Sequence, residues 1–161
     1  MNPVTTRGPI RRPSPVRLGL VLATMLVLVG ACGGASATPA PSLGPIELEG
    51  TKWLLVSYLS PTGTSFTVPS AVTPIATFEG GQLTAVTTGC NTANGPYTQD
   101  GTSIAIGPLA TTRLACQEPM ATVEAAYLQA LSVVDTAVGN ADRLVLRKAD
   151  GFTALEFVRG T

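Results

Sequence analysis

Histidine is absent from the 161-residue chain. The chain therefore cannot build a Ser-His-Asp or Cys-His nucleophilic system, and it lacks the imidazole that commonly binds zinc. Paired carboxylates are another common catalytic arrangement, and Glu79, Asp100, Glu118 and Glu124 are the candidates for it. Each lies beside an expected turn or on an expected helix, where a solvated carboxylate is the commoner explanation. We therefore expect no enzymatic activity, no metal site and no cofactor.

Charged residues are also scarce, at 12% of the chain, and their two signs are separated. The first 46 residues hold four of the ten basic residues and no acid. The remainder carries ten acidic residues against six basic ones, a net charge of about −4. Neither a basic face nor an alternation of aromatic and basic residues occurs, so we expect no nucleic-acid partner.

No apolar run is long enough to cross a bilayer. The longest, Leu18–Val29, has about 12 residues where roughly 20 are needed, and it follows four arginines. A basic stretch before a short apolar run is typical of a signal peptide. The Arg11-Arg12 pair continues into Pro13-Ser14-Pro15, which favours Sec export over a twin-arginine route. We predict a leader over residues 1–31.

A cysteine directly follows this leader, in Gly30-Ala31-Cys32. The small residues before Cys32 resemble the lipobox of bacterial lipoproteins. That resemblance implies cleavage before Cys32, a diacylglycerol thioether on its sulfur and stable anchoring by two or more fatty acyl chains such as palmitate. It places the protein on the extracytoplasmic side of the cell membrane. The alternative is a secreted protein in which Cys32 is a plain thiol. Residues 32–45, rich in Pro, Ala, Ser and Gly, are expected to form a tether.

Two further cysteines, Cys90 and Cys116, form an even pair in an oxidising compartment, where a disulfide is the expected state. Closing this loop would stabilise the fold by roughly 3.5 kcal/mol in the chain-entropy model. Two separate buried thiols are the alternative. The pair lacks the Cys-x-x-Cys spacing of thioredoxin-like redox sites.

Turn residues divide the remaining domain, residues 46–161, into short β-prone segments. The expected elements are a strand at Trp53–Leu59 ending in a turn at Ser60–Gly63; a hairpin of Ile75–Glu79 and Gln82–Thr87 across Gly80-Gly81; turns at Asn94-Gly95 and Asp100-Gly101, the second leading into Ser103–Ile106; and a hairpin of Leu144–Lys148 and Thr153–Val158 across Asp150-Gly151. Alternation along these strands indicates an inward face made by Ile104, Ile106, Leu144, Leu146, Leu155 and Phe157.

One segment has a helical period instead. Met120, Val123, Tyr127 and Leu131 recur at steps of three and four, which predicts an amphipathic helix over residues 119–132. Val133–Val138 is expected to continue as a strand or as an extended exit from the helix. The predicted fold is mainly β with one α-helix (α+β): a small, partly closed antiparallel β-barrel with the helix packed against it. We expect a monomer.

Several motifs of this domain resemble a known family. They are Trp53, Phe78 before a glycine turn, Gly89-Cys90-Asn91, Tyr97, Ile106-Gly107-Pro108-Leu109, Thr112-Arg113-Leu114-Ala115-Cys116, and Glu124 with Tyr127 and Leu131. Together they resemble the META domain of HslJ-like heat-shock lipoproteins, over about residues 47–158. The resemblance implies a small β-barrel with a helix and an envelope protein linked to stress or antibiotic tolerance. It implies no catalytic residues.

Asn91 and Arg113 are the candidate binding residues within these motifs. The Asn91 amide has the chemistry to recognise a ligand, but we favour a structural role in which it hydrogen-bonds its own turn. Arg113 is expected in a partly exposed salt bridge with Asp100 or Glu118. Two functions fit: a non-catalytic interaction module for an envelope protein, or a small-molecule carrier with a cavity inside the barrel. A filled interior with an exposed apolar patch would favour the module.

Overall fold

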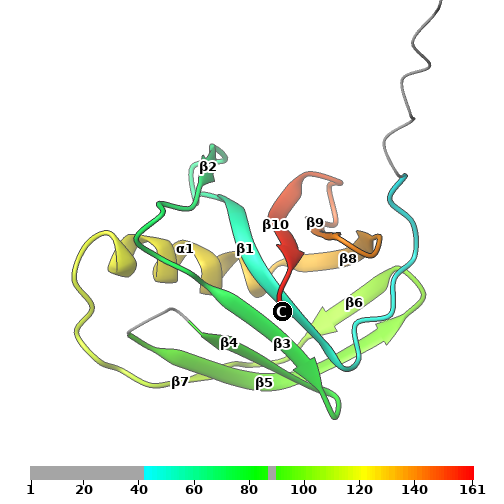
Figure 1. Cartoon of the computed structure of the whole chain (residues 1–161), viewed down its shortest axis with the longest axis horizontal. Helices are drawn as coiled ribbons and strands as arrows, with labels where there is room; N and C mark the ends of the chain where they lie inside the picture. The colour runs from blue at the N-terminus through cyan, green and yellow to red at the C-terminus, as the bar shows by residue number, and fades with distance from the viewer. Residues whose placement is uncertain (1–41, 87–89) are drawn as a thin grey trace, which may run out of the picture. The chain divides into compact units, whose positions relative to one another are not determined.

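Figure 1 shows a computed structural model of the chain, in which the structure describes residues 42–86 and 90–161. The predicted leader, Cys32 and most of the tether lie outside the described residues. The described part forms ten strands and one helix. They are β1 (Thr51–Leu59), β2 (Ser65–Thr67), β3 (Ile75–Glu79), β4 (Gln82–Val86), β5 (Thr92–Asp100), β6 (Ser103–Ile106), β7 (Ala110–Thr111), α1 (Met120–Leu131), β8 (Val134–Gly139), β9 (Arg143–Lys148) and β10 (Thr153–Arg159).

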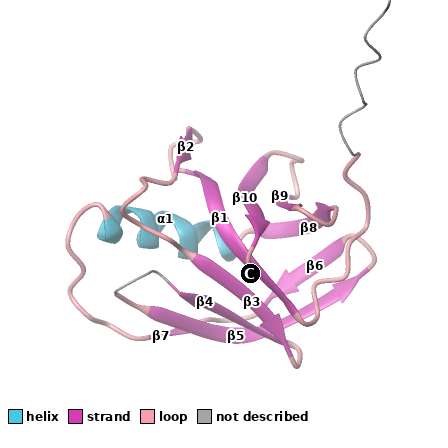
Figure 2. Ribbon diagram, viewed as in Figure 1, coloured by secondary structure: helices cyan, strands magenta, loops and turns pink. Residues whose placement is uncertain are grey.

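Eight of these strands close into an antiparallel barrel through their pairings, and Figure 2 shows these strands in magenta and α1 in cyan. The strand order is β10-β9-β8-β6-β5-β4-β3-β1, and β1 pairs again with β10 to complete the ring. The β6–β8 junction is the sparsest part of the ring, with a single register pair between Ser103 and Thr136. The predicted β-barrel with one helix is confirmed. Strand β2 extends the sheet beyond β1, and β7 pairs with β5 outside the ring.

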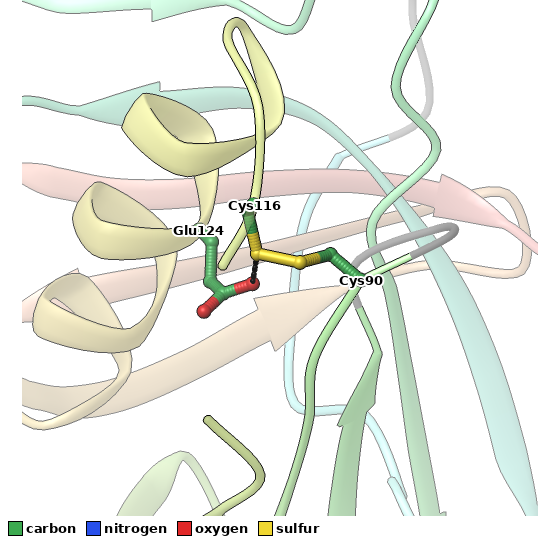
Figure 3. Close-up of side chains that lie close together, drawn as sticks. All are labelled: Cys90, Cys116 and Glu124. Carbon is green, nitrogen blue, oxygen red and sulfur yellow. Dashed lines mark hydrogen bonds between the residues drawn. A yellow bond between two sulfur atoms is a disulfide. The ribbon is translucent and has the colours of Figure 1, made fainter. Parts of the chain in front are cut away.

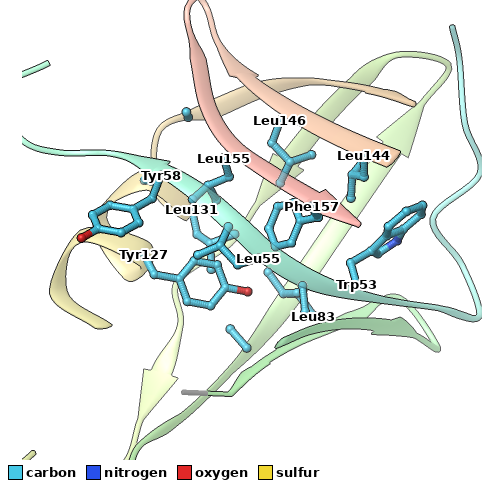
Figure 4. Close-up of a cluster of buried hydrophobic side chains, with 14 of the residues drawn as sticks. Trp53, Leu55, Tyr58, Leu83, Tyr127, Leu131, Leu144, Leu146, Leu155 and Phe157 are labelled. Atoms are coloured by element: carbon cyan, nitrogen blue, oxygen red, sulfur yellow. The ribbon is translucent and has the colours of Figure 1, made fainter. Parts of the chain in front are cut away.

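Large apolar side chains fill the barrel interior (Figure 4). Trp53, Phe78 and Phe157 are fully buried together with Leu83, Leu144, Leu146 and Leu155. The inward face predicted for the last hairpin is therefore confirmed, because alternate residues of a pleated strand point to the same side. The interior of the barrel is therefore occupied by the side chains of the hydrophobic core.

Hairpin predictions hold where a glycine has a positive φ. Gly80, Gly81, Gly101 and Gly151 all have φ between 57° and 84°, and each lies at a predicted turn. The turn predicted at Asn94-Gly95 is wrong, because both residues lie inside β5. A Cβ on Gly95 would come within 2.6 Å of the Pro108 carbonyl oxygen. This glycine therefore permits the close approach of a neighbouring backbone.

Helix α1 occupies the predicted segment and packs against β1 and β10. Its buried stripe is Val123, Ala126, Tyr127, Ala130 and Leu131. The Tyr127 hydroxyl donates to the Ile75 carbonyl at 3.2 Å, which satisfies the polar end of a fully buried ring. Burial also raises the pKa of Tyr127 far above its ordinary value.

A carboxylate ties the residues before β1 to the β3–β4 hairpin. Glu49 accepts hydrogen bonds from the Tyr97 hydroxyl at 2.8 Å and from the backbone N–H groups of Gly80 and Gly81. These bonds, with that from Tyr97 the largest cause, hold the pKa of Glu49 below its usual value. Burial, then the bond to Glu49, raises the pKa of Tyr97 to about 12.

The last residues of the predicted tether join the barrel. Gly44 pairs with Gly139 of β8 through two backbone hydrogen bonds of 2.9 and 2.8 Å. Contacts with the domain therefore begin two residues before the expected start at Ile46. Within residues 42–86 and 90–161, no helix has the length and apolarity needed to span a membrane.

Candidate functional site

Three of the family-like motifs, those that contain Cys90, Cys116 and Glu124, meet at a disulfide (Figure 3). Cys90, just before β5, is bonded to Cys116, which lies between β7 and α1, and their Cα atoms are 5.8 Å apart. This separation is typical of disulfide-bonded cysteines. The bridge predicted from cysteine parity is present. The disulfide fastens the connection that leads into α1 onto the start of β5.

Asn91 lies beside the disulfide and is only 5% exposed. Its side-chain oxygen accepts hydrogen bonds from the Leu114 backbone N–H at 2.8 Å and the Thr112 hydroxyl at 2.9 Å. Its amide nitrogen lies 2.8 Å from Glu124 Oε1 and 3.1 Å from the Leu114 carbonyl oxygen. These two acceptors use both amide hydrogens. The structural role expected for Asn91 therefore fits, but its partners belong to residues 112–114 and α1 and not to its own turn.

Glu124 connects this network to the helix. Its Oε1 accepts from Asn91, while its Oε2 lies 3.3 Å from Cys116 Sγ. A disulfide sulfur carries no hydrogen, so the second approach is a contact and not a hydrogen bond. Among the described residues, Cys90, Cys116 and Glu124 place their potential ligand atoms within 4.8 Å of one another. Sequence reasoning treated Glu124 as one of four separate acids and did not predict this grouping.

Arg113 takes no part in this network. It is exposed, and in the part of the chain that the structure describes it forms no ion pair with Asp100 or Glu118. The expected salt bridge is therefore wrong. Leu114 beside it is 64% exposed, because the Asn91 bonds hold its backbone and leave its side chain in solvent.

A second feature, missed from the sequence, is an apolar cleft between α1 and the β1–β2 hairpin. It has a volume of about 320 Å³. The hairpin contributes Tyr58, Ser60, Pro61 and Phe66, and the helix contributes Thr122, Ala125, Ala126 and Gln129. The Tyr58 and Phe66 rings stack with centroids 6.0 Å apart, yet Phe66 is still 48% exposed. The one signal in the sequence is a phenylalanine in the otherwise polar stretch Thr64-Ser65-Phe66-Thr67.

A smaller cleft of about 170 Å³ adjoins the first and shares Ser60, Pro61 and Gln129 with it. Lys148 and Val133 line its far side, and Val133 is 48% exposed. Phe152, 68% exposed, lies near Lys148, whose Nζ is 5.9 Å from its ring centroid. We name the two clefts together the α1 groove. Both clefts of the α1 groove open at the surface of the domain and lie outside the filled barrel interior.

Strand β2, beside the groove, ends the sheet. Among the described strands it pairs with β1 alone, through Tyr58–Phe66 and the flanking pairs. The Val68 N–H donates to the Val56 carbonyl, and hydrogen-bonded pairs alternate along an antiparallel ladder. The backbone groups of Phe66 therefore face β1, while those of Ser65 and Thr67 face the open edge.

The chain matches one protein family and resembles two solved structures over most of their length. A protein from Burkholderia xenovorans, solved by NMR, is 28% identical, covering 78% of this chain and 97% of that one with a TM-score of 0.60. A crystal structure of a duf4847 family protein from Bacteroides vulgatus has a TM-score of 0.50 at 14% identity, covering 70% of this chain and 94% of that one, and supports the fold alone. No curated protein matches. The META domain model matches residues 46–160, and the chain belongs to the META domain family.

Proposed function

We propose that the protein is a non-catalytic binding module of the cell envelope, anchored by lipid on Cys32, in which the α1 groove receives an extended segment of a partner protein. The observation that carries the proposal is the apolar cleft of about 320 Å³ beside the open edge of β2. A link to stress or antibiotic tolerance follows from the family resemblance and is part of the proposal.

An extended polypeptide fits this surface better than a compact ligand. Ser65 and Thr67 present backbone donors and acceptors at the edge of the sheet, which an added strand would pair. Alternate side chains of that strand would lie on the same face as Phe66 and enter the cleft. Main-chain hydrogen bonds would then supply affinity, and the apolar cleft would select for apolar side chains at alternate positions.

The alternative, a small-molecule carrier, was expected to use a cavity inside the barrel. Trp53, Phe78 and Phe157 fill that space and are fully buried. The surface groove has no enclosing lid among the described residues and its walls come from two elements, as a peptide site requires. These features support the interaction module over the carrier.

The test places a photo-reactive amino acid in the groove in living cells. Gln129 lines both clefts and is the probe position, while Gln82, exposed at the start of β4, is the matched control. A Thr67→Pro change removes one outward N–H and leaves the β1–β2 ladder intact, whereas Thr67→Ala keeps that N–H. We expect a discrete polypeptide cross-link at position 129 that persists in T67A and is lost in T67P.

The proposal fails if position 129 gives the same products as position 82. It also fails if the cross-link is insensitive to Thr67→Pro, because strand addition would then contribute nothing. Cross-linking to lipid or another small molecule in place of polypeptide would overturn it in favour of the carrier. Circular dichroism of both Thr67 variants checks that the fold is retained.

A further inference from the structure

The group formed by Cys90, Cys116 and Glu124 has the composition of a metal site, although its sulfurs are joined (Figure 3). The three residues come from the start of β5, the connection before α1 and α1 itself. Each is partly buried, so that its ligand atoms remain reachable from solvent. Thiolates and carboxylates are ligands for Zn²⁺, whereas a disulfide sulfur is not, because the thiolate is the binding form.

We propose that two-electron reduction of the Cys90–Cys116 disulfide opens a Zn²⁺ site made by both thiolates and the Glu124 carboxylate, with water in the fourth position. A dithiol reductant supplies two electrons and two protons, giving two cysteine thiols and leaving as its own disulfide. Zn²⁺ then replaces the two thiol protons, which pass to solvent. The inference is independent of the proposed groove function.

The Glu124 carboxylate already lies near the position that a bound ion would require. Zn–S bonds of about 2.3 Å and Zn–O bonds of about 2.0–2.2 Å in a tetrahedron put neighbouring ligand atoms roughly 3.5–3.8 Å apart. Glu124 Oε2 lies 3.3 Å from Cys116 Sγ, close to that spacing. The Cys90 and Cys116 Cα atoms, 5.8 Å apart, allow the sulfurs to separate by side-chain rotation once their bond is broken.

Asn91 supplies the outer support that a metal ligand requires. Its amide donates to Glu124 Oε1 at 2.8 Å, which leaves Oε2 directed toward the sulfur. Its nitrogen also lies 3.1 Å from Cys116 Sγ and 3.6 Å from Cys90 Sγ. Hydrogen bonds that orient the ligands are a regular part of protein zinc sites. Three neighbouring negative charges in the reduced state would repel one another, and a divalent cation relieves that repulsion.

The experiment uses the purified protein, reduced with dithiothreitol, freed of it without contact with oxygen, and titrated with Zn²⁺ against a chromophoric chelator. We expect one Zn²⁺ per reduced chain and none per oxidised chain. Glu124→Gln keeps an acceptor for Asn91 but removes the charged ligand, so we expect at least roughly 10-fold weaker binding. Glu118→Gln, a carboxylate outside the group, is the control and should bind as wild type does.

Thermal melts test whether the reduced protein is still folded when it binds Zn²⁺. Zn²⁺ should raise the melting temperature of the reduced wild type in a concentration-dependent way, because it binds the folded state. It should not raise that of the oxidised protein or of the Cys90→Ser/Cys116→Ser variant. A reduced wild type that binds Zn²⁺ no more tightly than the double serine variant overturns the proposal. Equal affinities of wild type and E124Q overturn the role of the carboxylate.

Discussion

At the scale of single residues, Asn91 connects more segments than any charged group near the disulfide. Its two bonds to Leu114, one to Thr112 and one to Glu124 join the start of β5 to the connection before α1 and to α1 itself. Removing such an amide leaves several donors and acceptors unpaired in a poorly solvated place, and each costs about 1–3 kcal/mol. The Asn91 side chain, which the sequence offers as a candidate for ligand recognition, thus makes its hydrogen bonds within the fold.

We expect Asn91→Ala to lower the free energy of unfolding by about 2–4 kcal/mol, because the Leu114 backbone groups lose their partner. Urea denaturation of the oxidised protein measures the change. Asn94→Ala is the control: Asn94 is exposed on β5 and accepts one bond from Thr84, so its loss should cost no more than about 0.5–1 kcal/mol. Equal losses in the two variants would contradict the central role of Asn91.

At the scale of elements, sequence periodicity predicts what depends on near neighbours and misses what depends on distant ones. The β3–β4 and β9–β10 hairpins, the turn into β6 and α1 follow from alternation, glycine turns and helical spacing. Gly95 was misjudged because its close neighbour, the Pro108 carbonyl, lies thirteen positions away in the chain. The α1 groove is not predictable for the same reason, since Phe66 and Ala125 line one cleft although 59 positions separate them in the chain.

The bond between Glu49 and the β3–β4 hairpin makes that element sensitive to acid. Because folding lowers the pKa of Glu49, its contribution to stability is present above the usual value of 4.5 and is lost as the pH falls through the lowered pKa. We expect wild type to be more stable than Glu49→Gln at neutral pH and the difference to shrink below pH 4.5. Denaturation of both proteins across that pH range measures the difference in stability. A constant gap between wild type and E49Q would contradict the assignment.

At the scale of the whole molecule, the disulfide fastens the connection between the two halves of the ring to the start of β5 in one of them. Strands β3–β6 follow one another around the barrel, as do β8–β10, and the chain passes between these halves through β7 and α1. Their direct junction, β6–β8, has a single register pair, so much of the link between the halves depends on β1–β10 pairing and on the connection that Cys116 fastens. The sequence predicts the bridge by parity alone, since two cysteines remain after Cys32, but not the approach of Glu124 on α1 to the Cys116 sulfur.

Breaking the bridge should therefore loosen the whole domain and not a local loop. The cysteines are separated by 26 positions, and a loop of about that size contributes about 3.5 kcal/mol in the chain-entropy model. We expect Cys90→Ser/Cys116→Ser to lower the melting temperature by roughly 10–15 °C, and metal-free reduction of wild type to do the same. Reductant should leave the melting temperature of the double variant unchanged. If reduced wild type melted where the oxidised protein does, the connection into α1 would be held by Asn91 and the packing of α1 alone, and the two halves of the ring would not depend on the bridge.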